Sequence, residues 1–276
     1  MGDDWWHAMH SPDGPVTFLV RADRAGAAVR VQAWGTGRAW AVEHAADIVG
    51  LHDEPLGFAP ANVVVASLHR RMRGLRVIRL GAVLDLAVAT TVEQRVTTVE
   101  ARRSWQALVR HHGAPAPGGR RFLLPPSEQV LRALPDWEWR RIGIENRRSS
   151  TVRGLARDAP GLERAVVAGA ATVERRLRSL RGIGPWTAAH VTHFASGDAD
   201  AVPIGDWHLP GHVGFALAGE PRADDDRMLE LLEPFRPHRA RVWRLIVSGT
   251  RSPPRRAPRA RIVDIMRSEA KRRRPA

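Results

Sequence analysis

Two features within residues 177–212 have the residue types needed to act on a polyanion. The first is a bend in which Gly182 and Gly184 flank Ile183. Glycine adopts positive φ at little cost and leaves the neighbouring backbone N–H groups uncovered. Apolar residues at helical spacing precede and follow the bend. Uncovered amides and the N-terminus of the second helix would therefore point at one place, and such a place binds an anion, most often phosphate.

The second feature is a carboxylate, Asp206, about twenty residues further along. It follows the apolar run 201–204 and precedes another helical pattern, so it is placed to cap that helix. A structural cap is the simplest role for an aspartate in this position. A second role arises because one short segment holds both this carboxylate and a predicted phosphate-binding bend.

The combined pattern resembles that of a known family. Residues 180–188 read Leu-Arg-Gly-Ile-Gly-Pro-Trp-Thr-Ala, and Asp206-Trp207 follows at the start of a helix. This resembles the helix-hairpin-helix DNA glycosylases, specifically the 3-methyladenine DNA glycosylase II type. The resemblance extends more thinly over residues 70–250. It implies a mainly α fold, in which a helical core with the helix-hairpin-helix follows a small N-terminal α+β domain with an antiparallel sheet.

The resemblance also implies DNA contacts. The hairpin contacts would come from Gly182, Ile183, Gly184 and Thr187. A second landmark of the family resembles residues 93–97, Glu-Gln-Arg-Val-Thr, which adds Gln94 and Arg95 as DNA-binding residues. In relatives, the residue after the glutamine is inserted into the duplex where the base has left. Here that residue is Arg95, whereas the closest relatives use an apolar wedge. A solvated helix residue is the alternative interpretation of Arg95.

The catalytic residue implied by the resemblance is Asp206. A carboxylate near the sugar stabilises the positive charge that develops as an N-glycosidic bond breaks, and it can orient water. Trp186, Trp207 and His238 are the candidates for the base pocket. His238 stands where members of the family have a tryptophan that stacks on the flipped base, so the sequence departs from the family pattern at this position. Packing in the core is the alternative role for Trp186.

The lysine count separates two glycosylase mechanisms. Lys271 is the only lysine, and it lies among arginines near the C-terminus. A Schiff-base mechanism needs a desolvated lysine in a pocket, so we predict a monofunctional enzyme that uses water. An alkylated purine is already cationic and leaves readily, so one carboxylate suffices once the base is outside the stack. The predicted activity is hydrolytic excision of alkylated, 3-methyladenine-like bases in base-excision repair.

Composition supports the same class of partner. The formal net charge is +14, and about +8 of it lies in residues 251–276, as suits a polyanion. Cysteine is absent, which excludes disulfides, cysteine-ligated zinc and an iron–sulfur cluster. No apolar run reaches the length of a membrane span. We expect a cytoplasmic, nucleoid-associated monomer that binds double-stranded DNA with damaged bases and uses no cofactor or metal. Whether the hairpin carries a monovalent cation is not decided by the sequence.

The predicted organisation has three parts: an α+β domain over residues 1–75, a helical core over 76–250 and a basic, flexible tail over 251–276. Alternation predicts strands, and 3.6-residue periodicity predicts helices. The expected strands are 15–21, 27–34 and 39–43. The expected helices include 45–50, 63–73, 84–96 continuing to 111, 146–157, 163–179, one beginning at Asp206, and 239–248.

Two other functions fit parts of the pattern. One is a non-catalytic helix-hairpin-helix module that binds DNA. The other is a metal-dependent hydrolase, because histidines surround the candidate carboxylate at spacings that can bind zinc. The residues of that second pattern are Asp206, His208, His212, His190 and His193. No Glu follows His208 as in the H-E-x-x-H motif, and a metal mechanism would leave the hairpin unused.

Overall fold

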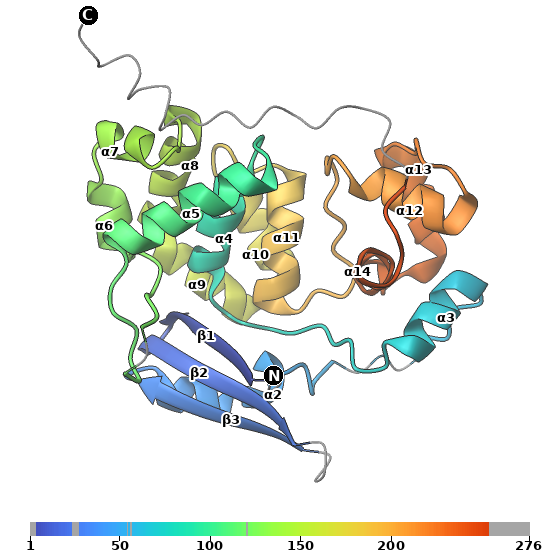
Figure 1. Cartoon of the computed structure of the whole chain (residues 1–276), viewed down its shortest axis with the longest axis horizontal. Coiled ribbons are helices and arrows are strands. Elements are labelled where there is room, and N and C mark those ends of the chain that lie inside the picture. Colours follow the sequence, from blue (N-terminus) through green and yellow to red (C-terminus); the bar gives the residue numbers. More distant parts are fainter. Residues whose placement is uncertain (1–3, 24–27, 54, 56, 120, 254–276) are drawn as a thin grey trace, which may run out of the picture.

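A computed structural model describes residues 4–23, 28–53, 55, 57–119 and 121–253. In this part of the chain, one small sheet lies beside two groups of helices (Figure 1). We call α4–α11 the first lobe, and α3 with α12–α14 the second lobe. None of the described helices is long and apolar enough to cross a bilayer.

The element bounds are as follows. The strands are β1 (Asp4–Ser11), β2 (Gly14–Asp23) and β3 (Ala28–Gly35). The helices that precede the first lobe are α1 (Arg38–Glu43), α2 (Ala45–Ile48) and α3 (Val63–Arg71). The first lobe contains α4 (Val83–Glu93), α5 (Thr98–His112), α6 (Glu128–Ala133), α7 (Asp136–Arg141), α8 (Asn146–Arg157), α9 (Ala159–Ala168), α10 (Ala170–Arg178) and α11 (Pro185–Ser196). The second lobe adds α12 (Leu209–Ala218), α13 (Asp225–Leu232), the 3₁₀ turn η1 (Glu233–Phe235) and α14 (Arg239–Gly249).

The sheet is an antiparallel meander with strand order β1-β2-β3. Its inward face buries Met9, Val16 and Phe18 in a core that also receives Trp40 and Ile48 from the two short helices that follow. β1 was not among the predicted strands. It exists because all eight of its residues pair with β2, from Asp4 opposite Arg21 to Ser11 opposite Gly14.

Residues 39–43, predicted as a third strand, are instead part of helix α1, and the strand prediction was wrong. Helical geometry buries Trp40 and the adjacent Ala41 together, whereas a strand would send them to opposite faces. The indole of Trp40 stacks on the ring of His44 four residues later, at 4.4 Å. That i, i+4 contact exists only in a helix.

The first lobe packs around α4, which contacts α5, α8, α9 and α11. Two predicted helices are each divided in the structure. The segment 84–111 breaks after Glu93, and Thr97 caps α5 through a capping box with Glu100. The segment 163–179 breaks at Gly169, whose φ of +100° ends α9. At both breaks the backbone takes a conformation that a continuous α-helix does not allow. The apolar periodicity continues across each break, so the pattern alone does not show it.

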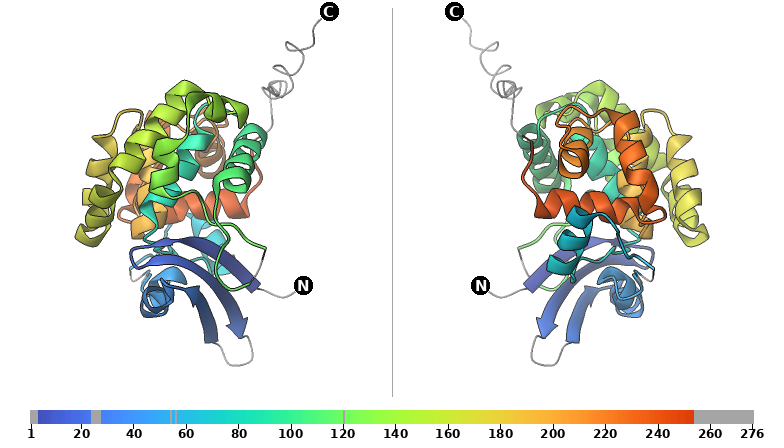
Figure 2. Two further views of the ribbon diagram at one scale, coloured as in Figure 1. Left: turned by 90° about the vertical axis from the view of Figure 1, so that its left-hand side faces the viewer. Right: turned by 90° about the vertical axis from the view of Figure 1, so that its right-hand side faces the viewer.

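The second lobe has its own core, which includes Val213, Leu232 and Ile246. Helix α3 completes this core with Val65 and Leu68, although it lies within the predicted N-terminal domain. Figure 1 shows α3 beside the helices that follow residue 200, and the side views in Figure 2 agree. The boundary proposed at residue 75 would therefore separate α3 from the helices on which it packs.

An ion pair joins the N-terminal segment to the second lobe. Asp53 accepts hydrogen bonds from Arg241 Nη1 at 2.8 Å and Nη2 at 2.5 Å, and from the backbone N–H of Val77 at 2.8 Å. Both members of the pair are buried, with side chains 7% and 2% exposed. The predicted basic tail, including Lys271, falls outside the described residues from position 254 onward.

Candidate functional site

The glycine bend joins α10 to α11 and forms a helix-hairpin-helix. Gly182 has φ +91°, and a Cβ there would collide with Thr151 Oγ1 of α8. Only glycine therefore fits, both for backbone strain and for space. Gly184 has an ordinary φ of −97° and is the N-cap of α11, so the expectation of positive φ holds for one of the two glycines. Ile183, between them, is 7% exposed and packs in the core of the first lobe.

The hairpin presents free backbone donors. Within the described chain, the N–H groups of Gly182 and Gly184 donate to no other group. Pro185 occupies the first position of α11, where its missing N–H costs nothing. Two uncovered amides beside a helix N-terminus provide hydrogen-bond donors and a positive dipole end for one phosphate oxygen cluster.

Asp206 lies between the lobes, in the segment that connects α11 to α12. Its Oδ1 accepts the backbone N–H groups of His208 and Leu209, both at 2.8 Å. The helix α12 begins at Leu209 with His208 as its N-cap, so it starts three residues later than predicted. Its Oδ2 accepts Nε1–H of Trp186 at 2.8 Å. Because Trp186 is the second residue of α11, this bond ties the carboxylate to the hairpin helix. The side chain is half-buried and open to solvent on one side.

The charge of Asp206 is stabilised by neutral dipoles. Partial burial alone would raise the pKa of this carboxyl group, but the hydrogen bonds from His208, Trp186 and Leu209 together lower it below its ordinary value. Within the described residues, no arginine or histidine pairs with this carboxylate. It is therefore ionised at neutral pH and keeps its full negative charge.

Aromatic rings pack behind Trp186. His190, one helical turn later, meets the Trp186 ring edge-on at 4.9 Å, and Trp243 of α14 meets His190 at 5.9 Å. Burial lowers the pKa of His190, so its imidazole is neutral and does not cancel the charge of Asp206. His190 was predicted both as part of the helical pattern after the bend and, alternatively, as a metal ligand. Its i, i+4 spacing from Trp186 agrees with the packing seen here.

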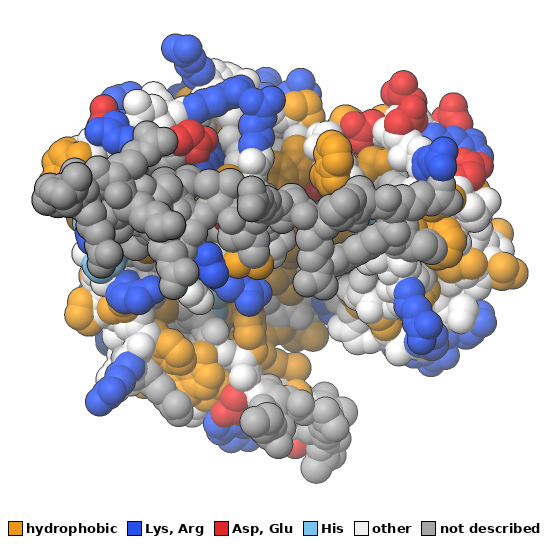
Figure 3. Space-filling view, turned by 45° about the horizontal axis from the view of Figure 1, so that its top comes forward, with side chains coloured by type: hydrophobic (Ala, Val, Ile, Leu, Met, Phe, Trp, Pro, Cys, Tyr) orange, Lys and Arg blue, Asp and Glu red, His pale blue; other side chains and the backbone are white. Residues whose placement is uncertain are grey.

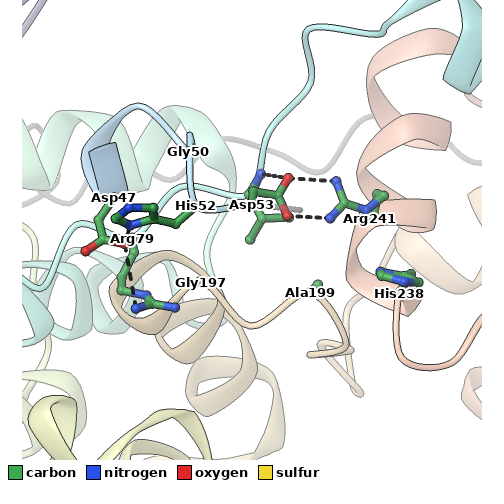
Figure 4. A pocket seen from close by; sticks show the side chains of 10 residues that line it. Asp47, Gly50, His52, Asp53, Arg79, Gly197, Ala199, His238 and Arg241 are labelled. Carbon is green, nitrogen blue, oxygen red and sulfur yellow. Dashed lines mark hydrogen bonds and ion pairs between the residues drawn. The ribbon is translucent and has the colours of Figure 1, made fainter. Parts of the chain in front are cut away.

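The other two base-pocket candidates lie in different surroundings. Trp207 is 91% exposed. His238 lines a cavity of about 230 Å³ whose other walls include Asp53, Arg79 and Arg241 (Figure 4). Its ring packs edge-on against Phe58 at 5.1 Å. The structure therefore brings Trp186 to the carboxylate, but records no contact of Trp207 or His238 with it.

The predicted DNA contacts at the end of α4 lie beside the hairpin. Gln94 Nε2 donates to Thr187 Oγ1 at 2.8 Å and to the Gly182 carbonyl at 3.2 Å. Arg95 follows with an exposed side chain and a φ of +58°. Thr187 itself is buried, so its hydroxyl faces Gln94 rather than solvent. The two landmarks of the sequence, 88 residues apart, form one site.

The metal-hydrolase pattern does not come together. Among the described residues, no group of three histidine, aspartate or glutamate side chains could hold a metal ion. His193 Nδ1 lies 2.7 Å from the Asp198 carbonyl, and His212 Nε2 lies 3.0 Å from Thr250 Oγ1. These two histidines are engaged in the core, so the sequence spacing does not make a ligand set.

Arginine side chains are spread over one face of the molecule. Figure 3 shows them over both lobes, with Asp and Glu gathered mainly at one end of the second lobe. The face is hollowed between the lobes, and hydrophobic side chains line the hollow. A surface of this kind suits a polyanionic ligand.

The fold, with its sheet, two lobes and hairpin, is shared with solved structures of DNA glycosylases. The chain is similar to the 3-methyladenine DNA glycosylase of Archaeoglobus fulgidus, with a TM-score of 0.72 and 18% identity over 88% of this chain and 86% of that one. It is also similar to the 8-oxoguanine glycosylase/lyase of Clostridium acetobutylicum, solved with double-stranded DNA, with a TM-score of 0.65 and 13% identity over 87% and 85%.

A third similar structure is the 3-methyladenine DNA glycosylase of Schizosaccharomyces pombe in complex with abasic DNA. Its TM-score is 0.56, with 16% identity over 73% of this chain and 96% of that one. No family model matches the sequence, and no curated protein matches it. The predicted fold class is thus confirmed, both in the helical core and in the small N-terminal sheet.

Proposed function

We propose that the protein is a monofunctional DNA glycosylase that excises alkylated, 3-methyladenine-like bases from double-stranded DNA with water. The observation that carries this proposal is the hydrogen bond between Trp186 and Asp206. It ties an ionised, half-exposed carboxylate to the helix whose N-terminus and preceding amides can hold a phosphate. Some structural neighbours act on 3-methyladenine, and some were solved with DNA, which supports this ligand class.

The chemistry follows from the charges. The C1′–N bond of the everted nucleotide breaks, its electron pair leaves with the base, and positive charge develops on the sugar. Asp206 offers a full negative charge to that centre, because only neutral donors hold it. Water then attacks C1′ and loses a proton to solvent or to the carboxylate. The lowered pKa makes Asp206 a weak base, so electrostatic stabilisation is its main contribution.

Phosphate binding by the hairpin supplies the register. The free N–H groups of Gly182 and Gly184 would hold one phosphate of the damaged strand. The base must leave the stack to reach the carboxylate, and Arg95 would enter the vacated space. A cationic base needs little help to depart, which suits a mechanism that relies on the charge of Asp206 and needs no strong general acid.

The test is base release from duplex DNA treated with a methylating agent, measured in EDTA by mass spectrometry of free bases. The wild-type protein should release methylated bases, and Asp206→Asn should not. Asp226→Asn is the matched control, because Asp226 is exposed on α13. Release abolished by EDTA would favour a metal enzyme. Binding of the DNA without release would favour a non-catalytic module.

Borohydride trapping examines the water-using mechanism separately. Lys271, the only lysine of the sequence, lies beyond the described residues, so the described part of the chain offers no lysine that could form a Schiff base. Incubation with abasic DNA and borohydride should yield no covalent adduct. An adduct that disappears in Lys271→Ala would overturn the monofunctional assignment.

A further inference from the structure

In the bend between α4 and α5, hydrogen bonds fix the residues before and after Arg95. On its incoming arm, the Val92 carbonyl accepts Nη1–H of the buried Arg148 at 2.6 Å. On its outgoing arm, Thr97 and Glu100 exchange the two hydrogen bonds of a capping box. The Arg95 guanidinium has no partner among the described residues. A surface loop needs no such fixation for stability alone.

The backbone at Arg95 is itself unusual. Arg95 is the only described residue other than glycine with positive φ, at 58°. L side chains rarely adopt this conformation, and it persists only where the surroundings impose it. Here it turns the chain so that the side chain of Arg95 is exposed while that of Gln94, the preceding residue, points back to the hairpin.

Gln94 makes the connection to the hairpin. Both of its hydrogen bonds leave from Nε2, to Thr187 Oγ1 in the first turn of α11 and to the carbonyl of Gly182. Gly182 in turn lies so close to Thr151 of α8 that there is no room for a Cβ atom. The amide of Gln94 is therefore fixed to the residue whose own N–H is free to bind phosphate.

We propose that Gln94 is a positioning residue that acts through Arg95. Its side-chain amide attaches the bend that carries Arg95 to the phosphate-binding hairpin. The Arg95 side chain, which acts as the wedge, therefore stays at a fixed distance from the hairpin amides that bind the phosphate. This inference rests on the proposed function, and it changes the role expected for Gln94 from a DNA contact to an internal strut. A wedge held in register enters the stack at a defined step from the gripped phosphate, and no ordering cost is incurred on binding.

The experiment compares binding to a duplex that contains an abasic-site analogue with binding to the same undamaged duplex. Gln94→Ala should reduce the preference for abasic DNA about tenfold, as expected for two lost hydrogen bonds. Its affinity for undamaged DNA should stay within about twofold, because the hairpin amides remain. Gln129→Ala, on the exposed surface of α6, is the matched control.

Two further variants separate positioning from general damage to the fold. Thr187→Val removes only the hydroxyl acceptor and should lower the abasic preference in the same direction. In an Arg95→Ala background, Gln94→Ala should have no further effect, because the strut has no wedge to position. 2-Aminopurine opposite the abasic site should report the loss of wedge insertion, and circular dichroism should show unchanged folding.

The outcomes distinguish this inference from the proposed function. If wild type prefers abasic DNA and Gln94→Ala keeps that preference, the strut is overturned while glycosylase activity is untouched. If Gln94→Ala and Arg95→Ala reduce the preference additively, Gln94 acts by itself and the positioning role is overturned. If no lesion is ever released but the abasic preference depends on Gln94, the strut stands and the catalytic assignment falls. If wild type shows no abasic preference, the wedge and its strut both fall.

Discussion

Asp206 and Asp53 are two aspartates that each accept three hydrogen bonds, yet they lie in opposite electrostatic situations. Asp53 is buried against Arg241, a cation that neutralises it. Asp206 is half-exposed and held by two backbone amides and an indole. The comparison teaches that the partners of a carboxylate decide its use. A carboxylate paired with an arginine joins segments, whereas one held by neutral dipoles keeps a charge that a developing cation can meet.

The largest expected effect is a loss of base release when Asp206, rather than Asp53, is replaced. Asp206→Asn should lower single-turnover base release by about 10²–10⁴-fold, the range for loss of a positioned catalytic group. Its stability to urea should change by less than about 1 kcal/mol, because asparagine also caps helices. A variant that releases bases at the wild-type rate would remove the distinction between the two aspartates.

The next effect is on stability. Asp53→Asn should lower the free energy of unfolding by about 3–5 kcal/mol, because Arg241 is left buried without its counter-charge. Urea unfolding followed by circular dichroism measures this, and Asp226→Asn should change nothing. A loss below about 1 kcal/mol would mean that the pair behaves like one on the surface.

Trp186→Phe sharpens the comparison, since it removes one of the neutral donors and keeps an aromatic ring. The pKa of Asp206 is lowered by this donor, so its loss should raise the pKa and shift the acid limb of the rate profile to higher pH. Base release at neutral pH should fall roughly tenfold, the value of one hydrogen bond to a charged group. Trp137→Phe, on an exposed residue of α7, should leave both quantities unchanged.

A third carboxylate provides the smallest effect. Hydrogen bonds from Arg141, together with His112, lower the pKa of Glu138 from 4.5 to about 2. A depressed folded-state pKa stabilises the protein above the unfolded value, and this stability is lost as pH falls from 4.5 towards 2. Melting temperatures of Glu138→Gln should therefore change less than those of wild type across that interval. Equal slopes would show that this pair contributes nothing to acid sensitivity.

Local patterns in the sequence predicted the parts of the site that local geometry creates. The bend at Gly182 depends on a few consecutive residues, and the structure has it. Asp206 accepts backbone N–H groups just after it, as a cap would, but the N-cap of α12 is His208. Helix α8 begins and ends at the predicted residues 146 and 157 for the same reason. The fold class was predicted from these motifs together with the helical periodicity around them, and the structure confirms it.

Contacts between distant segments were beyond such patterns. Nothing in the sequence near Gln94 indicates that its amide meets Gly182, and the tie between Asp53 and Arg241 spans 188 residues. The cavity beside His238 is built from four separate segments, so a motif that covers one of them could not place it. The helix at Trp40 was mistaken for a strand because a short apolar run is compatible with either structure. Trp40 and Ala41 are both buried, as in a buried strand or on one face of a helix.

The position of α3 has a consequence for biosynthesis. Val65 and Leu68 leave the ribosome long before α14, so their partners do not yet exist when this helix is made. During that interval the apolar face of α3 is exposed on the nascent chain, and a chaperone or the neighbouring sheet would have to shield it. The core of the second lobe can therefore be completed only after α14 has been made.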